Sequence, residues 1–129
     1  MMSTPLTYLA KKHRQEFVDF LFAANLVNKM HISRHFCERL AERGIEMNDI
    51  LRMLLPLIKI FRSQPDVIHR RFCVKWRNFT LFADIVRGPV SGERRIDLKT
   101  AYKFEHPYRE FYDELIKLPD IVTAYSEEK

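Results

Sequence analysis

The sequence predicts a single α+β domain over residues 1–129, with helices packed on a twisted, four-stranded antiparallel sheet. Two observations lead to this prediction. Up to Pro56, apolar side chains recur three and four positions apart, which is typical of amphipathic helices. From Ile58 to Phe104, apolar and polar side chains alternate, which is typical of strands. Because 47% of the residues are hydrophobic, one core can form without disulfides or metals.

Three helices are expected in the first half of the chain, over residues 4–28, 34–43 and 47–55. Thr4 followed by Pro5 is a suitable start for the first helix. Ser33 is a suitable N-cap for the second helix, and Gly44 a suitable left-handed residue just beyond its end. Pro56 ends the third helix, because proline lacks the amide hydrogen that a helix interior requires.

Four strands and a last helix are expected in the second half. The expected strands cover residues 58–62, 67–76, 79–87 and 94–104, and the expected helix covers residues 108–118. Arg77 and Asn78 are expected to form a tight turn between two of the strands. Because links this short join only antiparallel neighbours, the strands are expected to form an antiparallel meander.

The net charge of +5 is unevenly distributed. Residues 31–104 contain fifteen Lys and Arg against eight Asp and Glu, whereas residues 105–129 contain three against seven. A basic central segment favours a nucleic acid or an acidic protein as partner. Ordinary solubility charge explains the same excess equally well.

Cys37 and Cys73 are too few for a disulfide framework, and their spacing does not suit zinc. We therefore expect reduced thiols, a cytoplasmic location and neither a metal nor another cofactor. No apolar run is long enough to cross a membrane, so no membrane partner is expected.

The helix expected over residues 34–43 carries a cationic stripe. His35, Arg39 and Arg43 are four positions apart and therefore share one face. Such a stripe is suited to an anionic ligand. The alternative is a surface histidine beside two arginines that pair with acidic neighbours such as Glu42 and Asp97.

Alternation along the strand expected at 67–76 places three basic residues, His69, Arg71 and Lys75, on one face. The opposite face, which ends at Trp76, is apolar and can pack on the core. A row of cations can follow a phosphate backbone, and Trp76 or Tyr102 can stack on a base. A solvated strand face and core aromatic rings are the alternative interpretations.

Alternation along the last expected strand gives two further sets of residues. Ile96, Leu98, Thr100 and Tyr102 are expected on one face, and Arg95, Asp97, Lys99 and Lys103 on the other.

RNA cleavage without a metal needs proton transfer at the 2′-hydroxyl and the leaving oxygen, and cations for the developing charge. Histidine suits the first task and arginine the second. The helix stripe would supply these groups if it faced Arg71 and Lys75 across a groove, with Thr100 or Tyr102 orienting the phosphate. The candidate catalytic residues are His35, Arg39, Arg71, Thr100 and Tyr102. The candidate nucleic-acid-binding residues are Arg43, His69, Lys75, Trp76 and Lys103.

Four segments, ISRHFCERLAERGIEMNDIL, VIHRRFCVKW, FTLFADIV and RRIDLKTAYK, resemble the BrnT and RelE toxin superfamily. The family's opening helix has the form His-Ala-x-x-Arg-x-x-x-Arg-Gly-Ile, and its last strand ends in Thr-x-Tyr. The matching residues are His35, Arg39, Arg43, Gly44, Ile45, Thr100 and Tyr102. Phe36 stands where the family usually has alanine.

The resemblance covers residues 31–104, with residues 1–30 and 105–129 as helical additions to a RelE/BrnT-like core. It implies RNA as the ligand and an antitoxin as a frequent partner. Two functions remain open at this point. The first is a toxin-like RNA-binding protein with ribonuclease chemistry. The alternative is a non-catalytic protein that binds and modulates a host factor, suggested by the many Phe and Tyr residues of the expected terminal helices. The sequence predicts no oligomeric state.

Overall fold

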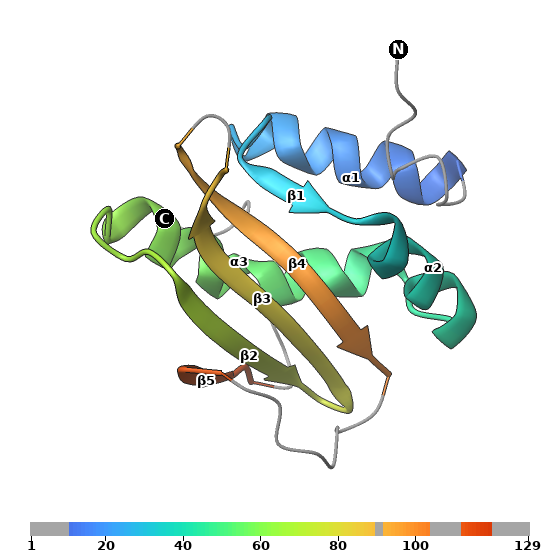
Figure 1. Ribbon diagram of the computed structural model, residues 1–129. Coiled ribbons are helices and arrows are strands. Elements are labelled where there is room, and N and C mark those ends of the chain that lie inside the picture. The colour runs from blue at the N-terminus through green and yellow to red at the C-terminus, as the bar shows by residue number, and fades with distance from the viewer. Residues whose placement is uncertain (1–10, 90–91, 104–111, 120–129) are drawn as a thin grey trace.

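The computed structural model describes residues 11–89, 92–103 and 112–119. These residues form an α+β arrangement in which helices line one side of a five-stranded sheet (Figure 1). The elements are α1 (Lys11–Ala23), β1 (Met30–Ile32), α2 (Arg34–Arg43), α3 (Met47–Ser63), β2 (Arg70–Trp76), β3 (Phe79–Arg87), β4 (Arg94–Tyr102) and β5 (Glu114–Lys117). The predicted α+β class is confirmed.

The sheet has the strand order β1-β4-β3-β2-β5 and is mixed. Strands β2, β3 and β4 form the predicted antiparallel meander, whereas β1 pairs with β4, and β5 with β2, in parallel. The prediction of four antiparallel strands was therefore wrong at both edges. The two edge strands have three and four residues, which is too short for an alternating pattern to be recognised.

Helix α3 continues through Pro56 and ends at Ser63. The prediction of a helix that stops at Pro56, followed directly by a strand, was wrong. Beyond the proline, Leu57, Ile58 and Phe61 are buried on the same face as the preceding turns. Burial of each such side chain contributes roughly 1.5–3 kcal/mol. The three together therefore outweigh the cost of about 3 kcal/mol for a proline in a helix interior.

The predicted ends of α2 are confirmed. The amide of Phe36 donates to Oγ of Ser33 at 3.0 Å, so Ser33 is the N-cap. Gly44 follows the helix with a φ of 64°. The amides of Gly44 and Ile45 donate to carbonyl oxygens in the last helical turn, at 3.3 and 3.0 Å, as in a Schellman motif.

The first and last predicted helices are corrected. Helix α1 ends at Ala23, before the predicted end at residue 28, because Asn25 and Asn28 adopt positive φ angles of 57° and 67°. The predicted helix at 108–118 is wrong over Glu114–Lys117, which form β5. Pairing with β2 decides this conformation, and that pairing is not visible in the local sequence. Residues 4–10 and 108–111 of these predictions lie outside the described part of the chain.

The core lies between the helices and one face of the sheet. Helix α3 runs behind β4, β3 and β2 in Figure 1, and α1 packs beside it. The strand residues that face this core are Phe72, Val74, Trp76, Leu81, Ala83, Ile85, Ile96, Leu98 and Ala101. No helix of the described residues covers the opposite face, which we call the outer face (Figure 1).

A β-bulge in β4 determines which residues reach the outer face. Phe82 pairs with Thr100 and Ala83 pairs with Leu98, so Lys99 is the extra residue. Beyond the bulge, Ala101 is buried in the core, and Thr100 and Tyr102 on either side of it lie on the outer face. The prediction that Thr100 and Tyr102 share a face with Ile96 and Leu98 was therefore wrong.

Candidate nucleic-acid interface

The outer face carries three rows of side chains that run across the strands. In the first row, Arg71 on β2 faces Asp84 on β3, Asp84 faces Asp97 on β4, and Asp97 faces His31 on β1. Arg71 is paired with Asp113, with Nη2 and Oδ1 3.2 Å apart. Asp97 is paired with Arg95, with Oδ1 and Nε 3.2 Å apart. Positive and negative charges therefore offset one another in this row.

The pKa values of two carboxyl groups, Asp84 in the first row and Asp113 beside it, are shifted in opposite directions. Burial raises the pKa of Asp84, and the negative charge of Asp97 acts in the same direction, while Lys99 and Arg71 oppose it. Hydrogen bonds from the side chain and amide of Arg71 lower the pKa of Asp113. The first row is thus a network of structural charges rather than an open cationic surface.

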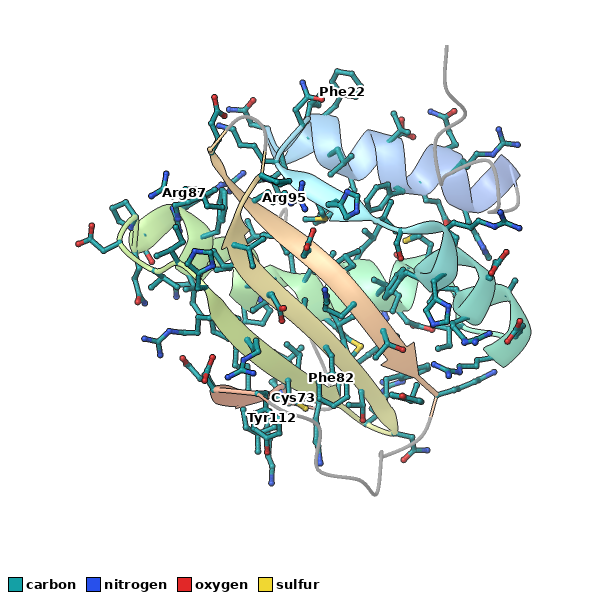
Figure 2. The ribbon with its side chains drawn as sticks, in the orientation of Figure 1. Phe22, Cys73, Phe82, Arg87, Arg95 and Tyr112 are labelled. Carbon is teal, nitrogen blue, oxygen red and sulfur yellow. The ribbon has the colours of Figure 1, made fainter. Side chains whose placement is uncertain are left out.

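The middle row is apolar at its centre. Cys73 on β2 pairs with Leu115 on β5 and with Phe82 on β3. The ring of Phe82 lies edge-on to that of Tyr102, with centroids 6.3 Å apart, and its centroid is 6.4 Å from that of Tyr112. Cys73, Phe82 and Tyr112 lie together in Figure 2, at the end of the face away from Arg95. Phe82 is nearly buried, while Tyr112 remains 36% exposed.

The third row contains Lys75 on β2, Thr80 on β3 and Tyr102 on β4, with Lys117 of β5 beside Lys75. No Asp or Glu of β2–β5 lies in this row. Lys117 is exposed, Lys75 and Tyr102 are half-buried, and Thr80 is fully buried. Among the described residues, this end of the outer face therefore carries two lysines next to an aromatic ring.

Arg43, the last residue of α2, completes the third row. Its Nη1 donates to the carbonyl oxygen of Ala101 at 2.7 Å and to Oγ1 of Thr100 at 3.2 Å. Its Cζ lies 4.3 Å from the ring centroid of Tyr102. Its Nε and Nη2 have no hydrogen-bond partner among the residues that the structure describes. The structure therefore fixes a guanidinium group that keeps donors for an anion.

The structure brings three of the predicted site residues together, namely Arg43, Thr100 and Tyr102. It does not bring the helix stripe together with Arg71. His35 is exposed, makes no hydrogen bond or ion pair with another described residue, and lies about 12 Å from Arg43 along the helix axis. Arg39 is paired with Glu42 at 2.7 Å. Arg71 lies on β2, which β3 separates from β4.

The other predicted binding residues lie at different places. Trp76 is 2% exposed, faces the core and stacks on Phe79 with centroids 5.6 Å apart. His69 is exposed just before β2, with a φ of 55°. Nζ of Lys103 donates to the carbonyl oxygen of Gly44 at 3.2 Å, so Lys103 lies beside the end of α2.

Three residues of the interface were missed by the sequence analysis, namely Phe82, Tyr112 and Lys117. Phe82 shares its face of β3 with Thr80 and Asp84, and the sequence analysis assigned no binding role to that strand. Tyr112 and Lys117 fall in the segment that was expected to be helical. Only the pairing of β5 with β2 reveals where they lie.

Two further findings concern His, Cys, Asp and Glu side chains of the described residues. Among residues 11–89, 92–103 and 112–119, no group of three His, Cys, Asp or Glu side chains is placed to hold a metal ion. Burial raises the pKa of the Cys37 thiol to about 11, so it stays protonated at neutral pH. None of the helices in this part of the chain is both long enough and apolar enough to span a bilayer.

Comparisons with protein-family models, curated proteins and solved structures give no match to this chain. The relationship to BrnT and RelE toxins therefore stays a prediction from the residues quoted above.

Proposed function

We propose that this protein binds single-stranded RNA across the third row of the outer face. The observation that carries the proposal is the position of Arg43, fixed by Ala101 and Thr100 with Nε and Nη2 left for a ligand. A planar guanidinium matches two oxygens of one phosphate group, and its fixed position reduces the entropy lost on binding.

The aromatic residues support a single strand rather than a duplex. Tyr102 and Tyr112 flank Phe82 and are both partly exposed to solvent. Unpaired bases stack on such rings, whereas the bases of a duplex are already stacked and paired. The choice of RNA over DNA depends on the resemblance in residues 31–104.

The distribution of charge supports a path along the third row. Lys75, Lys117 and Arg43 share this end of the face, while the carboxylates Asp84 and Asp97 lie in the first row beside cations of their own. Among the described residues, the third row therefore offers a polyanion a more favourable surface than the first row, where cations and carboxylates alternate.

Binding is proposed without an assigned cleavage step. The group of Arg43, Thr100 and Tyr102 contains cations and hydroxyls but no imidazole, since His35 lies two helical turns away. Proton transfer to and from RNA at neutral pH needs a side chain whose pKa is about 7. We therefore assign no cleavage reaction to these three residues.

The alternative, a protein-binding modulator, depended on surplus aromatic residues near the chain ends. In the structure, Phe17 and Phe20 are buried in the core, and Tyr112 lies on the outer face. Phe22 is 69% exposed and points away from the domain in Figure 2. One exposed ring on α1 is weaker support than the third row, so RNA binding is the function that we propose.

Fluorescence anisotropy tests the proposal with a labelled RNA of about 12 nucleotides, the same sequence as DNA, and an RNA duplex. We expect the single-stranded RNA to bind most tightly. Arg43→Gln is expected to weaken binding about tenfold, because a hydrogen-bonded charge contact contributes roughly 1.5–3 kcal/mol. Lys59→Gln is the control, because Lys59 is exposed on α3 behind the sheet.

A second variant shows whether weaker binding of Arg43→Gln results from a lost contact or from a folding defect. The double variant Lys75→Gln/Lys117→Gln changes two strand residues and is expected to weaken binding while the circular dichroism spectrum stays the same. Equal affinity for all three nucleic acids would contradict the proposal. A loss of RNA affinity in Lys59→Gln as large as that in Arg43→Gln would also contradict it. Gel analysis of the same samples in EDTA, beside His35→Ala, tests cleavage separately.

A further inference from the structure

Asp84, in the first row of the outer face, is half-buried and forms no hydrogen bond or ion pair with another described residue. Asp97 and Asp113, whose charges repel it, are each paired with an arginine. Lys99 and Arg71 attract Asp84, but neither of them forms an ion pair with it. A half-buried carboxyl group without a partner is costly to the fold, and such a group is a candidate for ligand binding.

Asp84 lies beside the aromatic part of the middle row. It follows Phe82 by two residues on β3, so the two side chains share the outer face about 7 Å apart along the strand. The ring centroid of Tyr112 is 6.4 Å from that of Phe82. Tyr112 also precedes Asp113, which is bonded to Arg71, the residue that pairs with Asp84 across the sheet. A base stacked on the exposed ring of Tyr112 would therefore have Asp84 at its edge.

The cations of the third row lie on the other side of the aromatic rings. Thr80 precedes Phe82 by two residues on β3, so this row is also about 7 Å from Phe82 along the strand. Arg43 and Lys75 belong to this row. The three rows thus present cations, aromatic rings and a carboxyl group in sequence. The same order of partners suits the phosphate, the base and the far edge of the base in one nucleotide.

The chemistry of a carboxylate distinguishes the four bases of RNA. An ionised carboxyl group has two oxygens that accept hydrogen bonds and no donor. The Watson–Crick edge of guanine carries two adjacent donors, N1–H and the N2 amino group, which match both oxygens. Adenine and cytosine offer one amino group next to an acceptor, and uracil offers one N–H between two carbonyl oxygens. A carboxylate therefore favours guanine most and uracil least.

We infer that Asp84 binds the Watson–Crick edge of a guanine whose ring stacks on Tyr112, in the same RNA strand that Arg43 holds by a phosphate group. This inference rests on the proposed function and adds a base preference to it. It also gives a role to a carboxyl group that has no partner on a face that binds a polyanion.

RNAs of about eight nucleotides test the inference by fluorescence anisotropy, within the range of small single-strand sites. One RNA contains only uridine, the second has one central guanosine, and the third has inosine in its place. The guanosine RNA is expected to bind about tenfold more tightly than the uridine RNA, because a bidentate contact discriminates by at least this factor. Inosine lacks the N2 amino group, so its RNA is expected to have an intermediate affinity.

Asp84→Asn is expected to remove the preference for guanosine, because an amide group presents only one acceptor oxygen beside a donor. The same variant is expected to bind the uridine RNA at least as tightly as the wild type does, because a negative charge is lost. Circular dichroism checks that the variant is folded. Asp66→Asn, at an exposed position between α3 and β2, is the control for charge and should keep the preference.

The outcomes separate this inference from the proposed function. If the wild type binds the three RNAs equally, or if Asp84→Asn keeps the preference for guanosine, the role of Asp84 is overturned. The proposed function still stands in that case if Arg43→Gln weakens the binding of all three RNAs. If none of the RNAs binds, both are overturned.

Discussion

The guanidinium of Arg43 lies over the ring of Tyr102, with Cζ 4.3 Å from the ring centroid, and it donates to the carbonyl oxygen of Ala101 at 2.7 Å. One side chain thus joins the end of α2 to the end of β4. It stabilises the fold and presents donors to solvent at the same time. These two roles can be separated by substitution.

Arg43→Lys is expected to lower the free energy of unfolding by about 1–2 kcal/mol. Lysine keeps the positive charge, but it cannot reach Thr100 and Ala101 with one planar group while it stacks on Tyr102. Urea denaturation followed by circular dichroism measures the change. Lys59→Arg, at an exposed position on α3, is the control and should change stability little. A lysine variant as stable as the wild type would show that these contacts contribute nothing to folding.

Gly44→Ala tests the left-handed end of α2. With φ at 64°, an alanine there costs about 1–2 kcal/mol of stability. The nearest atom to the added Cβ, Nζ of Lys103, is 3.7 Å away, so the expected loss comes from the backbone and not from a clash. Gly44→Asn should lose less than the alanine variant, because asparagine tolerates this region. Equal losses in thermal unfolding would argue against the backbone explanation.

Helix α2 could be predicted because its signals are local. Ser33 and Gly44 act on amides within one turn of themselves, so the sequence window contains both the cause and its effect. The signals for the turn at Arg77 and for the strand that follows it are also local. The structure has this turn, and β3 covers residues 79–87 as predicted.

The missed elements depend on contacts between residues distant in sequence. Strand β5 exists because residues 114–117 pair with β2, and β1 exists because Met30–Ile32 pair with β4. The bulge at Lys99 moved Thr100 to the outer face, and no feature of the sequence indicated the shift. For the same reason, only part of the site could be predicted. Arg43, Thr100 and Tyr102 lie together as expected. Arg71 does not join them, because it is paired with Asp113 at the other end of the face.

Pro56→Ala is expected to stabilise the protein by about 1–2 kcal/mol. Alanine restores a helical hydrogen bond within α3, and this gain exceeds the roughly 0.4–1 kcal/mol that proline contributes by restricting the unfolded chain. The midpoint of urea unfolding should therefore increase. A decrease would indicate that the proline ring fits a bend on which the packing of α3 depends.

The pH dependence of stability should change in opposite directions for Asp84→Asn and Asp113→Asn. The pKa of Asp84 is raised in the folded state, so ionisation of this carboxyl lowers stability as the pH rises through and above its ordinary pKa of 3.8. Removing the charge should make the protein more stable at pH 7, and this gain should disappear below about pH 4.

The pKa of Asp113 is lowered by Arg71, so its carboxylate contributes stability above the unfolded-state pKa and loses it as the pH falls through the folded-state value. Asp113→Asn should therefore be less stable than the wild type at pH 7 and match it in acid. Urea denaturation of both variants between about pH 3 and pH 7 provides the comparison. Changes of the same sign at pH 7 would contradict the assigned causes.

The most direct measurement of RNA binding at the third row is an NMR titration of the 15N-labelled protein with single-stranded RNA. The proposal predicts that the largest shifts fall on the amides of Thr100, Ala101, Tyr102 and Lys75 and on the side chain of Arg43, while exposed residues of α1 and the amide of Lys59 keep their positions. Shifts confined to the helices behind the sheet, or no shifts at all, would contradict it.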